Sequence, residues 1–241
     1  MNKVKMDQYY YLLLILLTLM FPLAWSFESK IQYYKKWFAL FPAIFITTFF
    51  FIGWDQWFTY LEVWSFNEQY LIGKQWGNLP LEECLFFVVI PFSTLFIYEV
   101  MRYYWPRDPF RNWVKEITWT LALLLIVIAV FNWDKLYTRV NFLTCAIILM
   151  GHYLMFKKKH LGLFFVFYLI HLIPFLLVNG ALTGAFSVEP VVIYNPKEVL
   201  GIRVFTIPIE DFVYSMGLML MNISFYEGIK TWKLFPIRLV K

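Results

Sequence analysis

Seven long apolar stretches, separated by shorter polar or charged segments, divide this sequence. They cover approximately residues 8–27, 36–53, 81–104, 113–132, 139–156, 161–178 and 204–229. Each is close to the ~20 residues that an α-helix needs to cross the hydrocarbon core of a bilayer. The pattern predicts an all-α, polytopic membrane protein with seven transmembrane helices. The first stretch lacks a small-x-small cleavage site, so we interpret it as a spanning helix and not as a signal peptide.

Composition and charge support this prediction, and the distribution of charge also predicts the orientation of the chain in the membrane. Only 15% of the residues are charged, whereas soluble domains carry about 25%. In a membrane protein the position of the basic residues matters more than the net charge of +5, which therefore does not indicate nucleic-acid binding. Seven of the 21 lysines and arginines fall on the N-terminal side of the predicted membrane and fourteen on the other. This predicts a cell-membrane protein with its N-terminus outside, its C-terminus in the cytoplasm, and the long loops 54–79 and 179–203 on the outer side.

Two segments of the chain match each other without gaps, 66–99 and 194–227. "PLEE" begins at Pro80 and "PIED" begins at Pro208, 128 residues later. Because six identities fall on polar or special residues, we predict two parallel three-helix repeats, 1–105 and 136–241, joined by a linking span in 106–135. The identical pairs are Asn67/Asn195, Gly73/Gly201, Pro80/Pro208, Glu82/Glu210, Tyr98/Tyr226 and Glu99/Glu227, and Glu83 matches Asp211.

The two acid pairs are the main candidates for chemistry. Glu82, Glu83, Glu210 and Asp211 fall in the first turn of their predicted helices, after prolines that suit the first helical position. Acids also stabilise a helix N-terminus, so each could be a capping residue at the interface. Adjacent helical residues point about 100° apart, however, so one acid of each pair must face the bundle. Intramembrane acids are functional candidates, and paired carboxyl groups can divide the roles of acid and base.

Several further residues are weaker candidates. Aromatic faces can stabilise a cation, although an interfacial aromatic belt explains most residues of this kind. Glu99 and Glu227 lie ~24 Å further along their helices and favour a supporting role. Histidines and cysteines show no metal-ligand spacing, so no metal is predicted, and Cys84 and Cys145 are interpreted as core residues. The candidates for contact with substrate or a cation are Trp54, Asp55, Trp57, Phe58, Asn67, Asn179 and Asn195; the supporting candidates are Pro80, Pro208, Tyr98, Glu99, Tyr226 and Glu227.

Taken together, these motifs resemble the membrane-integral lycopene cyclase family in its fused form, over essentially the whole length. The resemblance is carried by "PLEE", "PIED", "WDQWFTYLEVWSFN", "FPA", "NGALTG" and the helix ends "IYE" and "FYE". It implies a lycopene β-cyclase, an isomerase of the intramolecular lyase type in carotenoid biosynthesis. A carboxylic acid would protonate the terminal alkene of lycopene, the next alkene would close a six-membered ring, and a base would remove a ring proton, giving γ-carotene and then β-carotene. Glu82, Glu83, Glu210 and Asp211 would be catalytic, with acid and base unassigned.

The resemblance also implies the partners, and it leaves alternatives open. The substrate would be a membrane-dissolved C40 carotenoid, with the bilayer as surroundings and association with other carotenoid enzymes left open. Nothing is oxidised overall, so no cofactor is predicted, although a non-redox need for a reduced nucleotide or a flavin stays open. A retinal protein is disfavoured because no lysine lies between Val204 and Gly228. A small proton-coupled transporter or scaffold, an ε-ring cyclase, or a cyclase of another linear carotenoid remain alternatives.

Overall fold

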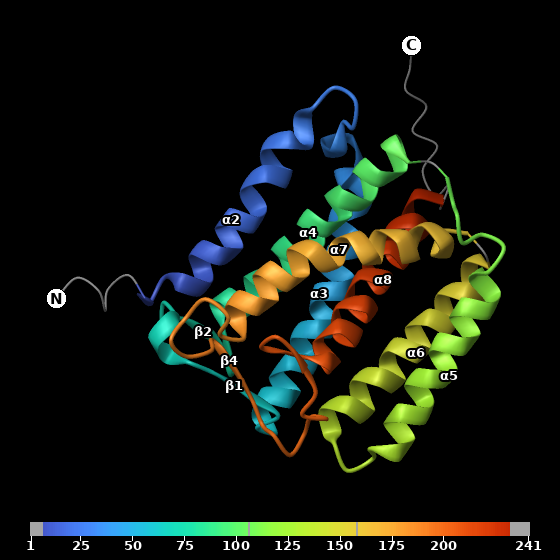
Figure 1. Ribbon diagram of the computed structural model, residues 1–241. Coiled ribbons are helices and arrows are strands. Elements are labelled where there is room, and N and C mark those ends of the chain that lie inside the picture. The colour runs from blue at the N-terminus through green and yellow to red at the C-terminus, as the bar shows by residue number, and fades with distance from the viewer. Residues whose placement is uncertain (1–6, 106, 158, 232–241) are drawn as a thin grey trace.

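Helices dominate the structure, a computed structural model that describes residues 7–105, 107–157 and 159–231. The described chain is 71% helical, which confirms the all-α prediction. Figure 1 shows one bundle, with α2 at one side, α5 at the other, and the short strands gathered at one end. The α-helices are α2 (Tyr10–Ala24), α3 (Trp37–Tyr60), α4 (Leu81–Tyr104), α5 (Val114–Phe131), α6 (Leu136–Phe156), α7 (Leu161–Leu182) and α8 (Ile209–Thr231).

Six helices of the described chain, α2 to α7, are long and apolar enough to cross a membrane. The seventh predicted span, 204–229, is a helix only from Ile209, and α8 does not reach the same apolar length. Its position explains why: α8 packs against α3, α4 and α6, so its polar side chains face protein. A helix surrounded by other helices does not need the hydropathy of one that faces lipid. Some of the basic residues used for the orientation lie outside the described residues, namely Lys3, Lys5, Lys158, Lys233, Arg238 and Lys241.

Two predicted helix ends were wrong in an informative way. The second apolar stretch was expected to end at 53, but α3 continues to Tyr60, which places Trp54, Asp55, Trp57 and Phe58 in a helix and not in a loop. The sixth was expected to end at 178, but α7 continues to Leu182 and includes Asn179. Asp55 is buried at the end of α3 and Asn179 bonds to α8, so these polar groups face the bundle interior and not water.

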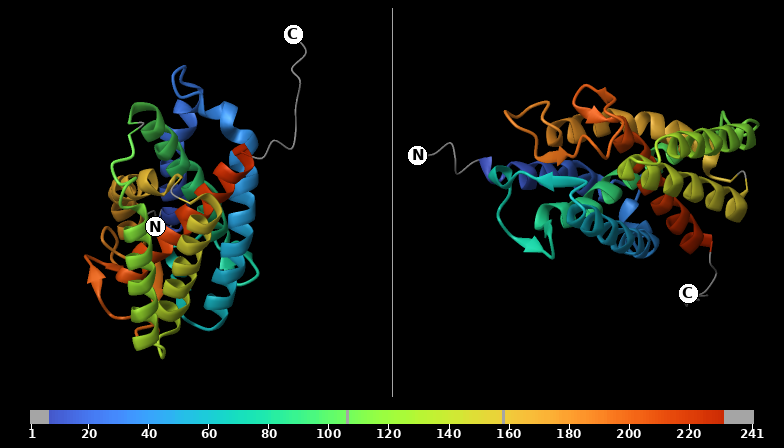
Figure 2. Two further views of the ribbon diagram at one scale, coloured as in Figure 1. Left: turned by 90° about the vertical axis from the view of Figure 1, so that its right-hand side faces the viewer. Right: turned by 90° about the horizontal axis from the view of Figure 1, so that it is seen from below.

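Three short antiparallel strand pairs connect the helices at one end of the bundle (Figure 1; further views in Figure 2). β1 (Trp64–Phe66) pairs with β4 (Val192–Tyr194), so the loop between α3 and α4 is joined directly to the loop between α7 and α8. The pairs β2 (Gln75–Trp76) with β3 (Leu79–Pro80), and β5 (Arg203–Val204) with β6 (Ile207–Pro208), have the same register 128 residues apart. Each pair precedes the helix that carries an acid pair. The three-residue 3₁₀ segments are Trp25–Phe27 and Glu68–Tyr70, and a four-residue one is Tyr33–Lys36.

The contacts between helices differ between the two halves. In the first half, α3 packs against α4 and also against α8. In the second half, α7 packs mainly against α4, and it reaches α8 through side chains such as Tyr168 and Asn179 without the close backbone packing of α3 on α8. This separation of α7 from α8 leaves space beside α4 and α2, and the cavity described below lies there. Cys84 and Cys145 are buried free thiols, as the sequence predicted.

Candidate active site

The first acid of each pair accepts a hydrogen bond from the backbone of the loop that precedes its helix. Glu82 and Glu210 are fully buried. Oε1 of Glu82 accepts a hydrogen bond from the backbone N–H of Ile72 (2.7 Å), and Oε1 of Glu210 accepts one from Leu200 (2.6 Å), ten residues upstream in each case. Thr138 also donates to Glu210, at 2.7 Å. Neither glutamate lines the cavity. Pro80 is the residue just before α4, one position earlier than predicted.

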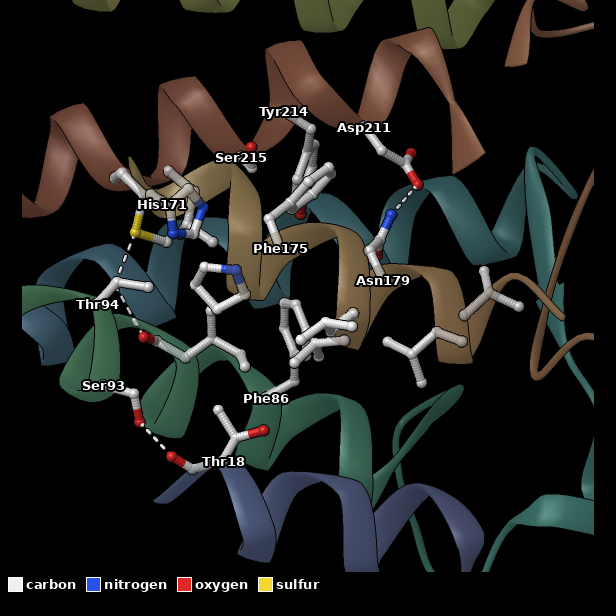
Figure 3. Close-up of a pocket in the computed structure, with 18 of the residues that line it drawn as sticks. Thr18, Phe86, Ser93, Thr94, His171, Phe175, Asn179, Asp211, Tyr214 and Ser215 are labelled. Carbon is white, nitrogen blue, oxygen red and sulfur yellow. Dashed lines mark hydrogen bonds between the residues drawn. The ribbon is translucent and has the colours of Figure 1, made fainter. Parts of the chain in front are cut away.

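The second acid of each pair faces a cavity of about 400 Å³. Glu83 and Asp211 both line it, and both are at most 7% exposed. Asp55, from the last turns of α3, lines the same end. The remaining walls are mostly apolar and come from α2, α4, α7 and α8, as Figure 3 shows for a subset of the residues. Three carboxyl groups therefore lie at one end of a space whose other walls suit a hydrocarbon.

Asp211 receives three hydrogen bonds. Tyr137 donates to Oδ1 at 2.8 Å, while Tyr194 and Asn179 donate to Oδ2, each at 2.7 Å. The Asn179 bond is visible in Figure 3. Burial, and then the neighbouring Asp211, raise the pKa of Tyr194 well above its ordinary value, so this hydroxyl keeps its proton and acts as a donor. Three donors on one carboxyl group favour its ionised form.

Glu83 and Asp55 have a different arrangement. Both carboxyl groups are buried and line the same cavity, Glu83 from the first turn of α4 and Asp55 from the end of α3. Tyr11 donates to Oε2 of Glu83 at 2.8 Å, and Tyr214 donates to Oδ1 of Asp55 at 2.7 Å. The cavity end thus combines two carboxyl groups that each accept a hydrogen bond from one tyrosine with a third, Asp211, that accepts from three donors.

The predicted aromatic residues lie behind this end and do not line the cavity. Trp54 and Phe58 are buried, and their rings lie 5.5 Å from Tyr214 and 6.0 Å from Tyr137, respectively. They support the tyrosines that hold the acids. Trp57 is 47% exposed and is not among the residues that line the cavity.

The two predicted loop asparagines also lie outside the cavity. Asn67 Oδ1 accepts from the Gln69 N–H, and Asn195 Oδ1 accepts from the Lys197 N–H, both at 3.1 Å. The Asn195 amide also donates to the Glu62 carbonyl in the other half, at 3.2 Å. These contacts close turns and link the loops. Of the three predicted asparagines, Asn179 alone lines the cavity.

Glu99 and Glu227 form an ion-pair cluster at the opposite end of the bundle. Arg102 bonds to both, and Lys230 lies 3.3 Å from Glu99 and 3.5 Å from Glu227. Lys36 contacts Glu99 at 2.5 Å, and Tyr226 donates to Glu99 at 2.8 Å. Because three of these six contacts cross between α4 and α8, the cluster joins the two halves. Tyr98 is buried beside it.

His160, just before α7, approaches this cluster without strengthening it. Its Nδ1 lies 3.8 Å from Oε2 of Glu227. Burial, followed by the nearby charge of Arg102, lowers the pKa of His160 to about 4. The imidazole is therefore neutral at neutral pH, and its contact with Glu227 is not an ion pair.

Five residues of the site were not predicted from the sequence. They are the tyrosines that bond to the acids, Tyr11, Tyr137, Tyr194 and Tyr214, and the cavity residue His171. Tyr214 stands three residues after Asp211, one helical turn away, and that spacing could have identified it. Tyr11 and Tyr137 come from the starts of distant helices. In a chain with 16 tyrosines, many at interfaces, no local signal separates them from the others.

Fold and site together define a membrane protein with a carboxyl-rich, acid–base centre at one end of an apolar cavity. The sequence profile described as "Lycopene cyclase" matches residues 8–101 and 134–229, once in each half, and the chain belongs to this family. It is similar to a protein of Leptosphaeria maculans named "Bifunctional lycopene cyclase/phytoene synthase", with 35% identity over 88 residues. That segment covers 36% of this chain but only 14% of the relative. No solved structure matches the chain.

Proposed function

We propose that this protein is a lycopene β-cyclase that converts the linear ends of lycopene into β-ionone rings. The observation that carries the proposal is the convergence of Glu83, Asp55 and Asp211 on one end of an apolar cavity. Family membership supports a carotenoid cyclase, and the β-ring product is our more specific inference. The reaction is an isomerisation, so it needs an acid, a base and a dry space, and no net oxidation.

The unequal surroundings of the carboxyl groups suggest their roles. Glu83 and Asp55 are buried in the wall of the same cavity, where a protonated carboxyl group can give a proton to the terminal double bond of lycopene. Protonation of one carbon of this double bond leaves a tertiary cation at the other carbon. The next alkene attacks this cation and closes the six-membered ring. Asp211, whose carboxyl group accepts three hydrogen bonds, can accept the ring proton whose loss forms the β-ring double bond. One proton enters and one leaves, so the balance is neutral.

The walls of the cavity support the cationic step. Trp64, Phe86, Phe175 and Tyr214 line it, and their rings can stabilise positive charge as it forms. The acids themselves are almost completely buried, which keeps water from trapping the cation. Figure 3 shows Tyr214 of α8 and Phe175 of α7 on one side of Asp211, which is directed toward Asn179.

We also propose how the chain sits in the cell. The distribution of basic residues favours an inner, or cell, membrane protein with its N-terminus outside and its C-terminus in the cytoplasm. The acid end would then lie at the outer face. Contacts that recur 128 residues apart support a tandem repeat of 1–105 and 136–241 joined through 106–135. We expect the substrate to enter from the bilayer, and other carotenoid enzymes could associate with the chain there.

Pigment analysis tests the function. The full chain is expressed in a lycopene-accumulating bacterium, beside Glu83→Gln, Asp211→Asn, Glu82→Gln and Glu210→Gln variants, and each protein is quantified in the membrane fraction. Cyclic carotenoid from the wild type, lost in the Glu83 and Asp211 variants, supports the proposal. Unchanged lycopene with wild-type protein present in the membrane overturns it. An ε-ring product would keep the cyclase class and overturn the β-ring assignment.

A further inference from the structure

His171 is a buried polar side chain that no other described residue satisfies. It lies in the middle of α7, is 2% exposed, and lines the cavity. Among the residues that the structure describes, neither its Nδ1 nor its Nε2 has a hydrogen-bond partner. Buried polar groups are nearly always paired, and an unpaired one calls for an explanation. A neutral imidazole offers one N–H donor and one acceptor nitrogen.

The surroundings of His171 do not supply that partner. Its ring lies among the rings of Phe167, Tyr168 and Phe175, at centroid distances of 5.8 to 5.9 Å. Figure 3 places it beside Thr94, on the far side of Phe175 from Asp211. Every hydroxyl group that lines the cavity donates its hydrogen to another atom of the protein; the seven belong to Thr18, Ser93, Thr94, Tyr137, Tyr194, Tyr214 and Ser215.

The helical spacing between His171 and Asn179 gives the distance between the imidazole and the acids. Asn179, eight residues further along α7, donates to Asp211 at 2.7 Å. Eight residues of α-helix correspond to about 12 Å. The imidazole and the carboxyl groups therefore mark two levels of one apolar cavity, about 12 Å apart. A linear chain with its reacting end at the acids would pass His171 at that distance.

We propose that His171 is a specificity-determining residue that binds an oxygen atom of the ligand, a hydroxyl or carbonyl group on a linear polyene whose cyclising end lies at Glu83 and Asp211. This inference rests on the proposed cyclase function and extends its substrate class to oxygen-bearing linear polyenes. The imidazole N–H donates to a carbonyl oxygen, or the imidazole both donates to and accepts from a hydroxyl. The hydrocarbon lycopene leaves both nitrogens without a partner, so a polyene with an oxygen at the matching distance binds more tightly.

Binding to the purified full chain in lipid nanodiscs tests this proposal. The probes are linear polyene aldehydes of increasing length, each with one intact lycopene end, and hydrocarbon polyenes of the same lengths. Quenching of tryptophan fluorescence gives each Kd. We expect an affinity maximum at the aldehyde whose oxygen lies about 12 Å from the cyclising end. At that length the aldehyde binds about ten- to a hundredfold more tightly than its hydrocarbon match.

Two substitutions identify the residue responsible. His171→Phe keeps an aromatic ring and removes both nitrogens, so the aldehyde preference falls to about equality. His171→Gln keeps a donor and an acceptor and retains part of the preference. Equal affinity for aldehydes and hydrocarbons at every length in the wild type overturns the proposal, whether or not the variants fold; so does a preference that persists in His171→Phe. Binding is measured without ring formation, so a failure of the cyclase function shows separately, as lycopene left unchanged.

Discussion

Replacing Asp211 by Asn or by Leu separates the chemistry of this residue from its part in folding. The carboxyl group accepts hydrogen bonds from Tyr137, Tyr194 and Asn179. In Asp211→Asn the amide oxygen can still accept the two bonds that reach Oδ2. Its NH₂ group takes the place of Oδ1 and can donate to the Tyr137 hydroxyl, which is able to accept. The network is kept, and the ability to take up a proton is lost.

The two substitutions should affect different quantities: Asp211→Asn the cyclisation rate, and Asp211→Leu the stability of the fold. A positioned general base contributes typically about 10²- to 10⁴-fold to the rate, so Asp211→Asn should form cyclic carotenoid at least about a hundredfold more slowly while reaching normal levels in the membrane. Asp211→Leu leaves three buried donors without an acceptor, at about 1–3 kcal/mol each. The sum of roughly 3–9 kcal/mol is comparable to the whole stability of a typical domain, about 5–15 kcal/mol. This variant should fail to accumulate.

The assay measures both quantities in the same cells. Carotenoids are extracted and separated by chromatography, and the tagged protein is quantified in the membrane fraction. Asp134→Asn, an exposed acid-to-amide change outside the cavity, is the matched control and should behave as wild type. A rate for Asp211→Asn within about tenfold of wild type would refute the role of Asp211 as base. Normal accumulation of Asp211→Leu would refute the stated cost of the unpaired donors.

Three further predictions follow from the geometry. Trp57→Leu should change the cyclisation rate by no more than about twofold, because the side chain is half exposed outside the cavity; a larger loss in the pigment assay would contradict this. Glu99→Leu removes the shared acceptor of three basic side chains and should lower the Tm in detergent by about 10 °C, and an unchanged Tm would show the cluster to be dispensable. The depressed pKa of His160 means that its unfolded form binds a proton between pH 6.5 and about 4 while its folded form does not, so stability falls as pH falls through this window, by up to about 3 kcal/mol. His160→Asn should lose less Tm between pH 7 and 5 than wild type does, and parallel losses would refute the assignment.

The sequence was sufficient for the helices and for the two places where acids begin a helix. Long apolar runs and the repeated Pro-x-acid-acid motif are local signals, and the predicted start at residue 81 coincides with α4. The ends of α3 and α7 were predicted too early, because Asp55 and Asn179 are polar residues that bond inward. Burial of a polar group is decided by its partner on another helix, and that partner cannot be read from the residue's own neighbourhood.

The division of work within each acid pair was likewise beyond the sequence. Adjacent residues of a helix point in different directions, which predicted that one member of each pair faces the bundle but not which member. The structure turns Glu82 and Glu210 toward the preceding loops and Glu83 and Asp211 toward the cavity. Of the predicted aromatic residues, Trp54 and Phe58 lie behind the tyrosines of the cavity wall, and Trp57 lies outside the cavity.

The departures from symmetry explain how a repeated motif can provide two unlike carboxyl groups. In the 128-residue register, Tyr194 and Tyr214 stand where the first half has Phe66 and Phe86, and all four line the cavity. The second half therefore supplies hydroxyl donors to Asp211 and Asp55 that the first half lacks. The separation of α7 from α8 opens the cavity on one side of the bundle. Equal halves would place two carboxyl groups in equal surroundings, and a proton would have no preferred donor or acceptor. The two phenylalanine-to-tyrosine differences and the displaced helix make the surroundings of the carboxyl groups unequal. One group can then act as the proton donor and another as the acceptor.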